Sequence, residues 1–138
     1  MSTTDQAASI QHMPGTEQQA NRAYSPAIIT RGGRTIYLAG QTALQGLDGK
    51  SLLGDFEGQT RTIFALLDRT LQSAGGALKD MVTMTVFIND ARHGDRFVEL
   101  RKEFFAVGRY PCSALITVSD FARPGMLIEI QGIAVVAD

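Results

Sequence analysis

The sequence predicts one α+β domain in which strands and helices follow one another in the order ββαβαββ. Three observations support this fold class: five runs have the composition of strands, two longer segments carry apolar residues at helical spacing, and glycine-rich turns separate these segments. The chain of 138 residues has the length of one domain and is long enough to bury a hydrophobic core of its own.

The five strand-like runs are short and rich in β-branched and aromatic residues. They cover residues 27–30, 34–39, 81–88, 113–119 and 126–136. Gly32 and Gly33 separate the first two runs, which predicts a β-hairpin. The third run alternates, with Val82, Met84, Val86 and Ile88 on one face and Thr83, Thr85 and Phe87 on the other. We therefore expect strand 81–88 to have two different faces.

The first helix is expected after the loop of residues 45–54, which is rich in glycine. Asp55 is a suitable N-cap, and Gly75 and Gly76 supply a stop. Between them, apolar residues recur mostly at steps of three and four: Phe56, Ile63, Phe64, Leu67 and Leu71. The spacing predicts an amphipathic helix of about five turns.

The second helix is expected over residues 95–107, before Gly108. Its apolar residues at helical spacing are Phe97, Leu100 and Phe104, and we expect Arg96, Arg101 and Lys102 to point outward. The pattern is typical of an amphipathic helix with one solvated face.

The sheet is expected to have one face that the helices leave uncovered, since two helices can cover only one face of the mixed sheet. The side chains expected there are Tyr37, Thr83, Thr85, Phe87, Leu115, Thr117, Leu127 and Ile133. This mixture is too apolar to leave in water, so we expect it to pack against copies of the same chain. The pattern alone leaves open whether two or three subunits assemble.

The composition argues against several classes of protein. A formal charge of −1 gives no field that would attract nucleic acid or an anionic membrane, and no apolar segment approaches the ~18–20 residues that span a bilayer. We therefore expect no nucleic-acid partner and no membrane partner. Residues 1–20 lack the pattern of a secretory signal, and the single cysteine cannot form an internal disulfide, so we expect a cytoplasmic protein. We expect a flexible N-terminal arm over residues 1–21 and one domain over residues 22–138.

Four blocks of the sequence carry a family resemblance. They are Tyr24-Ser25-Pro26-Ala27, then Tyr37 to Gln41, then Val82 to Asp90, and finally Leu127 to Ile130. In this order, and in register with the ββαβαββ pattern, they closely resemble the Rid (reactive intermediate deaminase, or YjgF) family. The resemblance implies a chorismate-mutase-like subunit, a homotrimeric barrel, and small-molecule pockets at the clefts between subunits.

The resemblance also implies a chemistry, from which this chain departs at one position. The best-studied branch hydrolyses imines and enamines such as 2-aminoacrylate to 2-oxoacids and ammonia, with no cofactor and no metal. Its arginine, which holds the substrate carboxylate, lies in a Pro-x-Arg block that reads Pro111-Cys112-Ser113 here. Val98 and Arg101 stand where that branch often has an asparagine and a tyrosine at the pocket. Because Ser113 supplies no charge, we expect an altered specificity.

The resemblance assigns candidate residues to the pocket. Glu129 aligns with the family's pocket glutamate and is the candidate catalytic residue; its alternative is a structural glutamate bonded to backbone amides across a subunit contact. The candidate substrate-binding residues are Tyr24, Ala39, Gly40, Ser113, Leu115 and Arg123. Arg123 or Arg109 could replace the missing cation. His12, His93 and Cys112 lack the spacing of metal ligands.

Two functions remain open at this point. The first is hydrolysis of a small imine, enamine or related metabolite, and the second is a non-catalytic trimer that binds a metabolite or regulates. A ribonuclease activity, proposed for some relatives, is disfavoured by the neutral charge.

Overall fold

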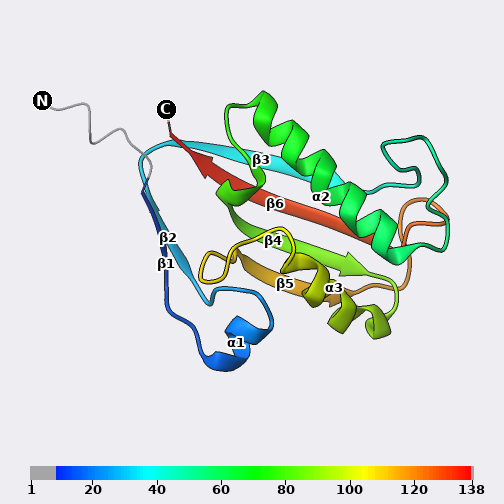
Figure 1. The fold of residues 1–138 in the computed structure, drawn as a ribbon, viewed down its shortest axis with the longest axis horizontal. Coiled ribbons are helices and arrows are strands. Elements are labelled where there is room, and N and C mark those ends of the chain that lie inside the picture. Colours follow the sequence, from blue (N-terminus) through cyan, green and yellow to red (C-terminus); the bar gives the residue numbers. More distant parts are fainter. Residues whose placement is uncertain (1–8, 138) are drawn as a thin grey trace, which may run out of the picture.

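The computed structural model describes residues 9–137 and has a mixed four-stranded sheet at its centre (Figure 1). The strands are β3 (Arg34–Gln41), β4 (Met81–Ile88), β5 (Cys112–Thr117) and β6 (Ile128–Val136). Their spatial order is β3-β6-β4-β5; β4 and β5 run parallel, and the other two pairs are antiparallel. The α+β class and the mixed sheet are confirmed.

Both long helices lie on the same face of this sheet, as predicted (Figure 1). Helix α2 (Phe56–Ser73) crosses β3 and β6, and α3 (Gly94–Arg101) lies over β4 and β5. Asp55 caps α2 by accepting a hydrogen bond from the amide of Gly58 at 2.9 Å, and Gly75 follows the helix at a φ of +88°. Helix α3 ends at Arg101, earlier than the expected residue 107. A 3₁₀ turn at Leu78–Asp80 precedes β4, and another at Ala91–His93 precedes α3.

The N-terminal region differs from the expectation. Residues 9–21 contain strand β1 (Ser9–His12) and helix α1 (Glu17–Asn21), while residues 1–8 lie outside the described residues. Thr16 and Gln19 form a capping box that starts α1. The Thr-Glu-Gln-Gln sequence at residues 16–19 carries this signal, which a reading based on hydrophobic periodicity overlooks.

The predicted hairpin between residues 27–30 and 34–39 is wrong in its pairing. Strand β2 (Ile28–Arg31) pairs antiparallel with β1, with His12 opposite Ile28, and β3 pairs instead with β6. The two glycines between β2 and β3, Gly32 and Gly33, both have positive φ and redirect the chain from the small sheet into the large one.

The hydrophobic core lies between the helices and the covered face of the large sheet. Its largest fully buried apolar residues include Ile63, Phe64, Leu67, Phe97, Met84, Ile88, Ile128 and Ile130. The buried Gln59 of α2 donates hydrogen bonds to the carbonyls of Leu52 and Gly125, both at 3.0 Å, and accepts one from the amide of Leu127. This side chain fixes the loops that lead into α2 and β6.

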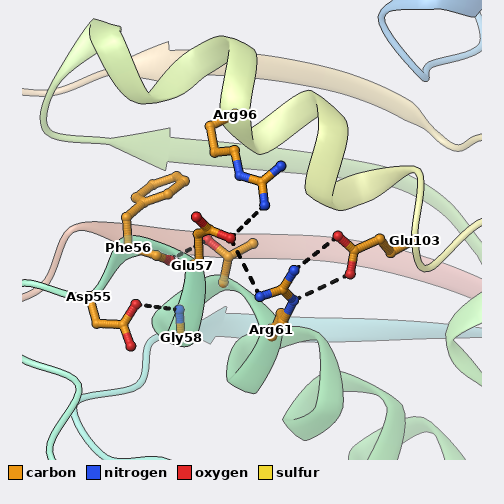
Figure 2. Close-up of polar contacts among 8 residues, drawn as sticks. Asp55, Phe56, Glu57, Gly58, Arg61, Arg96 and Glu103 are labelled. Carbon is orange, nitrogen blue, oxygen red and sulfur yellow. Dashed lines mark hydrogen bonds and ion pairs between the residues drawn. The ribbon is translucent and has the colours of Figure 1, made fainter.

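Charged side chains join α2 to α3 and to the segment just after α3 (Figure 2). Glu57 accepts a hydrogen bond from Arg96 at 2.5 Å, and Arg61 donates to Glu103 at 3.0 Å while also approaching Glu57 at 3.5 Å. Exposed ion pairs of this kind contribute little individually, but a network that alternates in sign fixes the relative placement of two helices. Here it holds the helix that ends at Arg101.

No helix of residues 9–137 covers the opposite face of the sheet (Figure 1). Thr83, Thr85 and Phe87 face this side, together with Tyr37, which is 78% exposed. The expectation that Leu115, Thr117 and Leu127 share this face is wrong. Leu115 and Thr117 stand beside Val86 and Ile88 in the parallel ladder, and Leu115 and Leu127 pack against the core. In β5 nearly every residue is apolar or small, so the sequence lacks the alternation of apolar and polar residues that would show which side chains face the helices.

Candidate functional site

One candidate site is a cavity of about 200 Å³ between α3, the start of β5 and the segment before β2. Its lining residues are Arg22, Tyr24, Val98, Arg101, Ser113 and Leu115. Three of the six predicted substrate-binding residues, Tyr24, Ser113 and Leu115, thus lie together. Val98 and Arg101, which the family resemblance also placed near the pocket, line it too.

Arg101 is the cation that faces Ser113. Its Nη1 donates a hydrogen bond to Oγ of Ser113 at 2.6 Å, and its Nη2 donates to the backbone carbonyl of Arg22 at 3.0 Å. The guanidinium also lies 5.0 Å from the centre of the Phe97 ring. These contacts hold a long basic side chain inside the subunit, where it is only 2% exposed.

The prediction that Arg101 points outward is therefore wrong. The sequence contained a signal: Arg101 is four residues after Phe97 and three before Phe104, so it lies on the apolar stripe of the helix. Burial, and to a lesser extent the charge of Arg22, lowers the pKa of Arg101 to about 10. A group with this pKa still carries its positive charge at neutral pH.

The two arginines considered as replacements lie elsewhere. Arg123 is exposed in the loop before β6, and Arg109 is exposed beside a separate cavity that His12 and Lys79 also line. Neither borders the cavity at Ser113. Arg22 does border it, but its guanidinium is engaged by Asp95 at 2.6 Å.

A second candidate group lies on the face of the sheet that no described helix covers, which we call the open face. Glu129 of β6 is half-buried and stands opposite Phe87 of β4. Its carboxylate is so close to Gly40 that a Cβ at residue 40 would collide with Oε2 of Glu129. Gly40 and its neighbour Ala39 lie where the pairing of β3 with β6 shifts register between Leu38 and Gln41, as in a β-bulge. Within residues 9–137, no hydrogen bond or ion pair of a single subunit engages the Glu129 carboxylate.

The two groups occupy opposite faces of the sheet. Ser113 pairs with Met84, which faces the helices, whereas Glu129 pairs with Phe87, which faces away from them. One subunit therefore places Tyr24, Ser113 and Leu115 in one location and Gly40 and Glu129 in another. Arg123 joins neither group.

Neither a metal cluster nor a membrane-spanning helix is found in the part of the chain that the structure describes. No group of three or more His, Cys, Asp or Glu side chains there could hold a metal ion. No helix there is both long and apolar enough to cross a bilayer.

Comparison with known proteins identifies the family. Residues 15–136 match the family model described as Endoribonuclease L-PSP, and the chain is 31% identical over 111 residues to a RutC family protein of Pyrococcus horikoshii, covering 80% of this chain and 85% of that protein. The chain belongs to the Rid (YjgF) family. The resemblance of the four sequence blocks is thereby confirmed.

Two further relatives resemble the chain, one in sequence and one in fold. The chain is 29% identical over 111 residues to the 3-aminoacrylate deaminase RutC of Acinetobacter baylyi, covering 80% of this chain and 85% of that one. The crystal structure of the Rid protein YyfB from Yersinia pestis superposes with a TM-score of 0.72, covering 94% of this chain and 98% of that one at 22% identity. This likeness confirms the fold of the subunit.

Proposed function

We propose that this Rid protein is a cofactor-independent hydrolase that deaminates a small imine, enamine or related carbonyl–nitrogen compound. The observation that carries the proposal is the Glu129 carboxylate, which lies against Gly40 and has no partner within one described subunit. A half-buried carboxylate that has no hydrogen-bond partner and lies beside the backbone of a glycine is suited to move protons for a bound substrate. A relative named 3-aminoacrylate deaminase supports the reaction class.

The proposed reaction consumes one water and releases one ammonia. An enamine first takes up a proton at carbon and becomes an iminium ion. Water then adds to the iminium carbon and gives one proton to Glu129, which passes it to the nitrogen. The C–N bond of this intermediate breaks, ammonia leaves, and loss of the hydroxyl proton yields the carbonyl product.

The proposed active form is a homotrimer with substrate clefts between subunits. Apolar side chains on the open face, among them Tyr37, Phe87 and Ile133, need a cover that the helices of the same subunit do not provide. An assembly would also allow the Glu129 group of one subunit to meet the Ser113 group of its neighbour. The separation of these groups within one subunit favours this arrangement.

Turnover is tested by generating 2-aminoacrylate with a pyridoxal-phosphate enzyme and measuring how much faster ammonia appears when the Rid protein is added. Wild-type protein should accelerate release, and Glu129→Gln should not. Gln131→Ala is a matched control, because Gln131 lies two residues further along the same strand on the same face. Acceleration by Glu129→Gln equal to wild type would reject Glu129 as the acid–base group.

Subunit mixing tests the shared cleft. If the site spans two subunits, trimers assembled from a mixture of Glu129→Gln and Ser113→Trp chains should recover part of the activity, since some clefts then contain neither substitution. Absence of recovery in mixed trimers, verified by native mass spectrometry, would place the site within one subunit.

The second candidate is a non-catalytic trimer that binds a metabolite, and the serine at position 113 favours it because the strand supplies no charge. A binder should gain thermal stability with ligand but release no ammonia from any imine tested. The ribonuclease in the family description is not proposed, since a formal charge of −1 offers little attraction for RNA.

A further inference from the structure

Arg101 is a buried cation without a carboxylate partner in the described part of the chain. Four other arginines have acidic partners: Arg22 with Asp95, Arg61 and Arg96 with Glu57, and Arg92 with Asp90. Arg34 donates to the carbonyl of Ala74 at 2.8 Å, but it is exposed to solvent, whereas Arg101 is buried. Arg101 instead binds a hydroxyl and a carbonyl, and both are neutral. A buried charge that is not neutralised is costly, so proteins retain one chiefly where something else supplies the opposite charge.

The hydrogen bonds of the guanidinium leave donors free. Nη1 and Nη2 each have two hydrogens, and the structure gives each nitrogen one acceptor. Nε is buried and has no hydrogen-bond partner among the described residues. Since Ser113 Oγ accepts from Arg101, its own proton is free to point away from the guanidinium, toward the cavity. Arg101 and Ser113 thus both offer hydrogen-bond donors to the cavity, and no acidic side chain is hydrogen-bonded to either of them.

The cavity in front of these donors is small and contains no acidic side chain in its lining. Tyr24 and Arg22 are the other polar residues of the lining, and Val98 and Leu115 are apolar. About 200 Å³ is below the size of sites for drug-like ligands, roughly 300–1,000 Å³. A short organic anion fits this volume and this lining.

From this arrangement we infer that Arg101, placed on helix α3, is the residue with which this protein selects anionic ligands, and that Ser113 positions its guanidinium. The charge that strand β5 lacks at residue 113 is supplied from the facing helix. The ligand class is a short monocarboxylate with an apolar tail. The inference rests on the proposed function in one respect, which is that the bound anion is a substrate or product of the deaminase. Binding of the anion by Arg101 does not itself require turnover.

A matched pair of neutral and charged probes tests the inference on the wild-type protein. Pyruvate and pyruvamide have nearly the same shape and differ in charge. Isothermal titration should show pyruvate binding at least ~10-fold more tightly, because a charge-assisted pair is stronger than a neutral hydrogen bond. Equal affinities, or no binding of pyruvate, would overturn the inference; the latter result is expected if a neighbouring subunit's carboxylate neutralises Arg101.

Variants assign the preference to the two residues. Arg101→Met should bind both probes alike, and Ser113→Ala should keep a preference for pyruvate that is reduced about 3-fold. Arg96→Met is the control: it removes an arginine from the same helix but on the exposed side, and it should leave the preference unchanged. If Arg101→Met does not fold, Arg101→Lys, which keeps the charge but loses the fork of donors, should weaken pyruvate binding without abolishing the preference.

These experiments distinguish a failure of the inferred anion binding by Arg101 from a failure of the proposed deaminase activity. A preference for pyruvate without ammonia release would support the anchor and reject the deaminase. Ammonia release with no preference between the probes, and no effect of Arg101→Met, would support the deaminase and reject the anchor.

Discussion

Nη1 of Arg101 lies 2.6 Å from Oγ of Ser113, so the guanidinium of a helix residue lies directly in front of Ser113 on strand β5. The small serine leaves room for the arginine opposite, and the arginine brings a positive charge that the serine lacks.

The first prediction concerns the pair of Arg101 and Ser113. Ser113→Arg alone should place two guanidiniums in one buried space and lower the free energy of unfolding by about 3 kcal/mol, since an unpaired buried charge has a cost of this order. The double variant Ser113→Arg with Arg101→Tyr should recover most of the loss, because one cation then remains. Urea denaturation measures both. A single variant as stable as wild type would show that Arg101 can leave its place without cost.

The second prediction concerns Gly40. A methyl group at this position collides with Oε2 of Glu129, so Gly40→Ala should move the carboxylate. A shift of about 1 Å at a reacting group can lower turnover roughly 100-fold, and we expect a loss of this size in the ammonia assay. Ala106→Gly, which changes one methyl group at an exposed residue outside both groups, serves as the control and should retain activity. Full activity in Gly40→Ala would disconnect Glu129 from catalysis.

The third prediction concerns the open face of the sheet. Tyr37→Lys and Ile116→Lys should shift the proposed trimer to monomer, because each places a charge on the apolar surface that this assembly would bury. Val107→Lys is the control, as Val107 is an apolar residue with 87% exposure in the loop after α3. Light scattering measures the mass. Trimers that persist in both variants would place the contact on another surface.

The fourth prediction concerns His12 of β1. Burial, followed by the charge of Arg109, lowers the pKa of this imidazole below its usual value near 6.5. The unfolded chain therefore binds the proton more readily than the folded chain between the two pKa values. Stability should be fully present above about pH 6.5 and fall as the pH drops through this window. His12→Gln should reduce this dependence, as measured by thermal unfolding at several pH values; an unchanged slope would contradict it.

Most of the fold could be predicted from the sequence because its elements have clear periods. The stripe from Phe56 to Leu71 fixes α2, and alternation from Val82 to Ile88 fixes β4. The pairing of β1 with β2 could not be predicted in the same way. Each strand has four residues and no strong alternation, and the glycines between β2 and β3 favoured a local hairpin over the contact that formed.

The site could be predicted less completely. Family resemblance pointed to Tyr24, Ser113 and Leu115, which do lie together, but it could not show that Glu129 is on the other face of the sheet. Arg101 was misjudged because basic side chains are usually solvated, although its spacing from Phe97 placed it inside. A buried arginine depends on tertiary partners such as the Arg22 carbonyl, which lies 79 residues away in sequence.

The register shift between Leu38 and Gln41 has a consequence for how this protein can change by insertion or deletion. Leu38 pairs with Gly132 and Gln41 with Ile130, so two residues an odd number of steps apart belong to the same side of the sheet. The strand therefore carries one extra residue at this point, as in a β-bulge. Deleting Ala39 or Gly40 would restore regular alternation and leave Gln41 opposite Ile130. A deletion here would thus keep the pairing on both sides and remove only the extra residue beside Glu129.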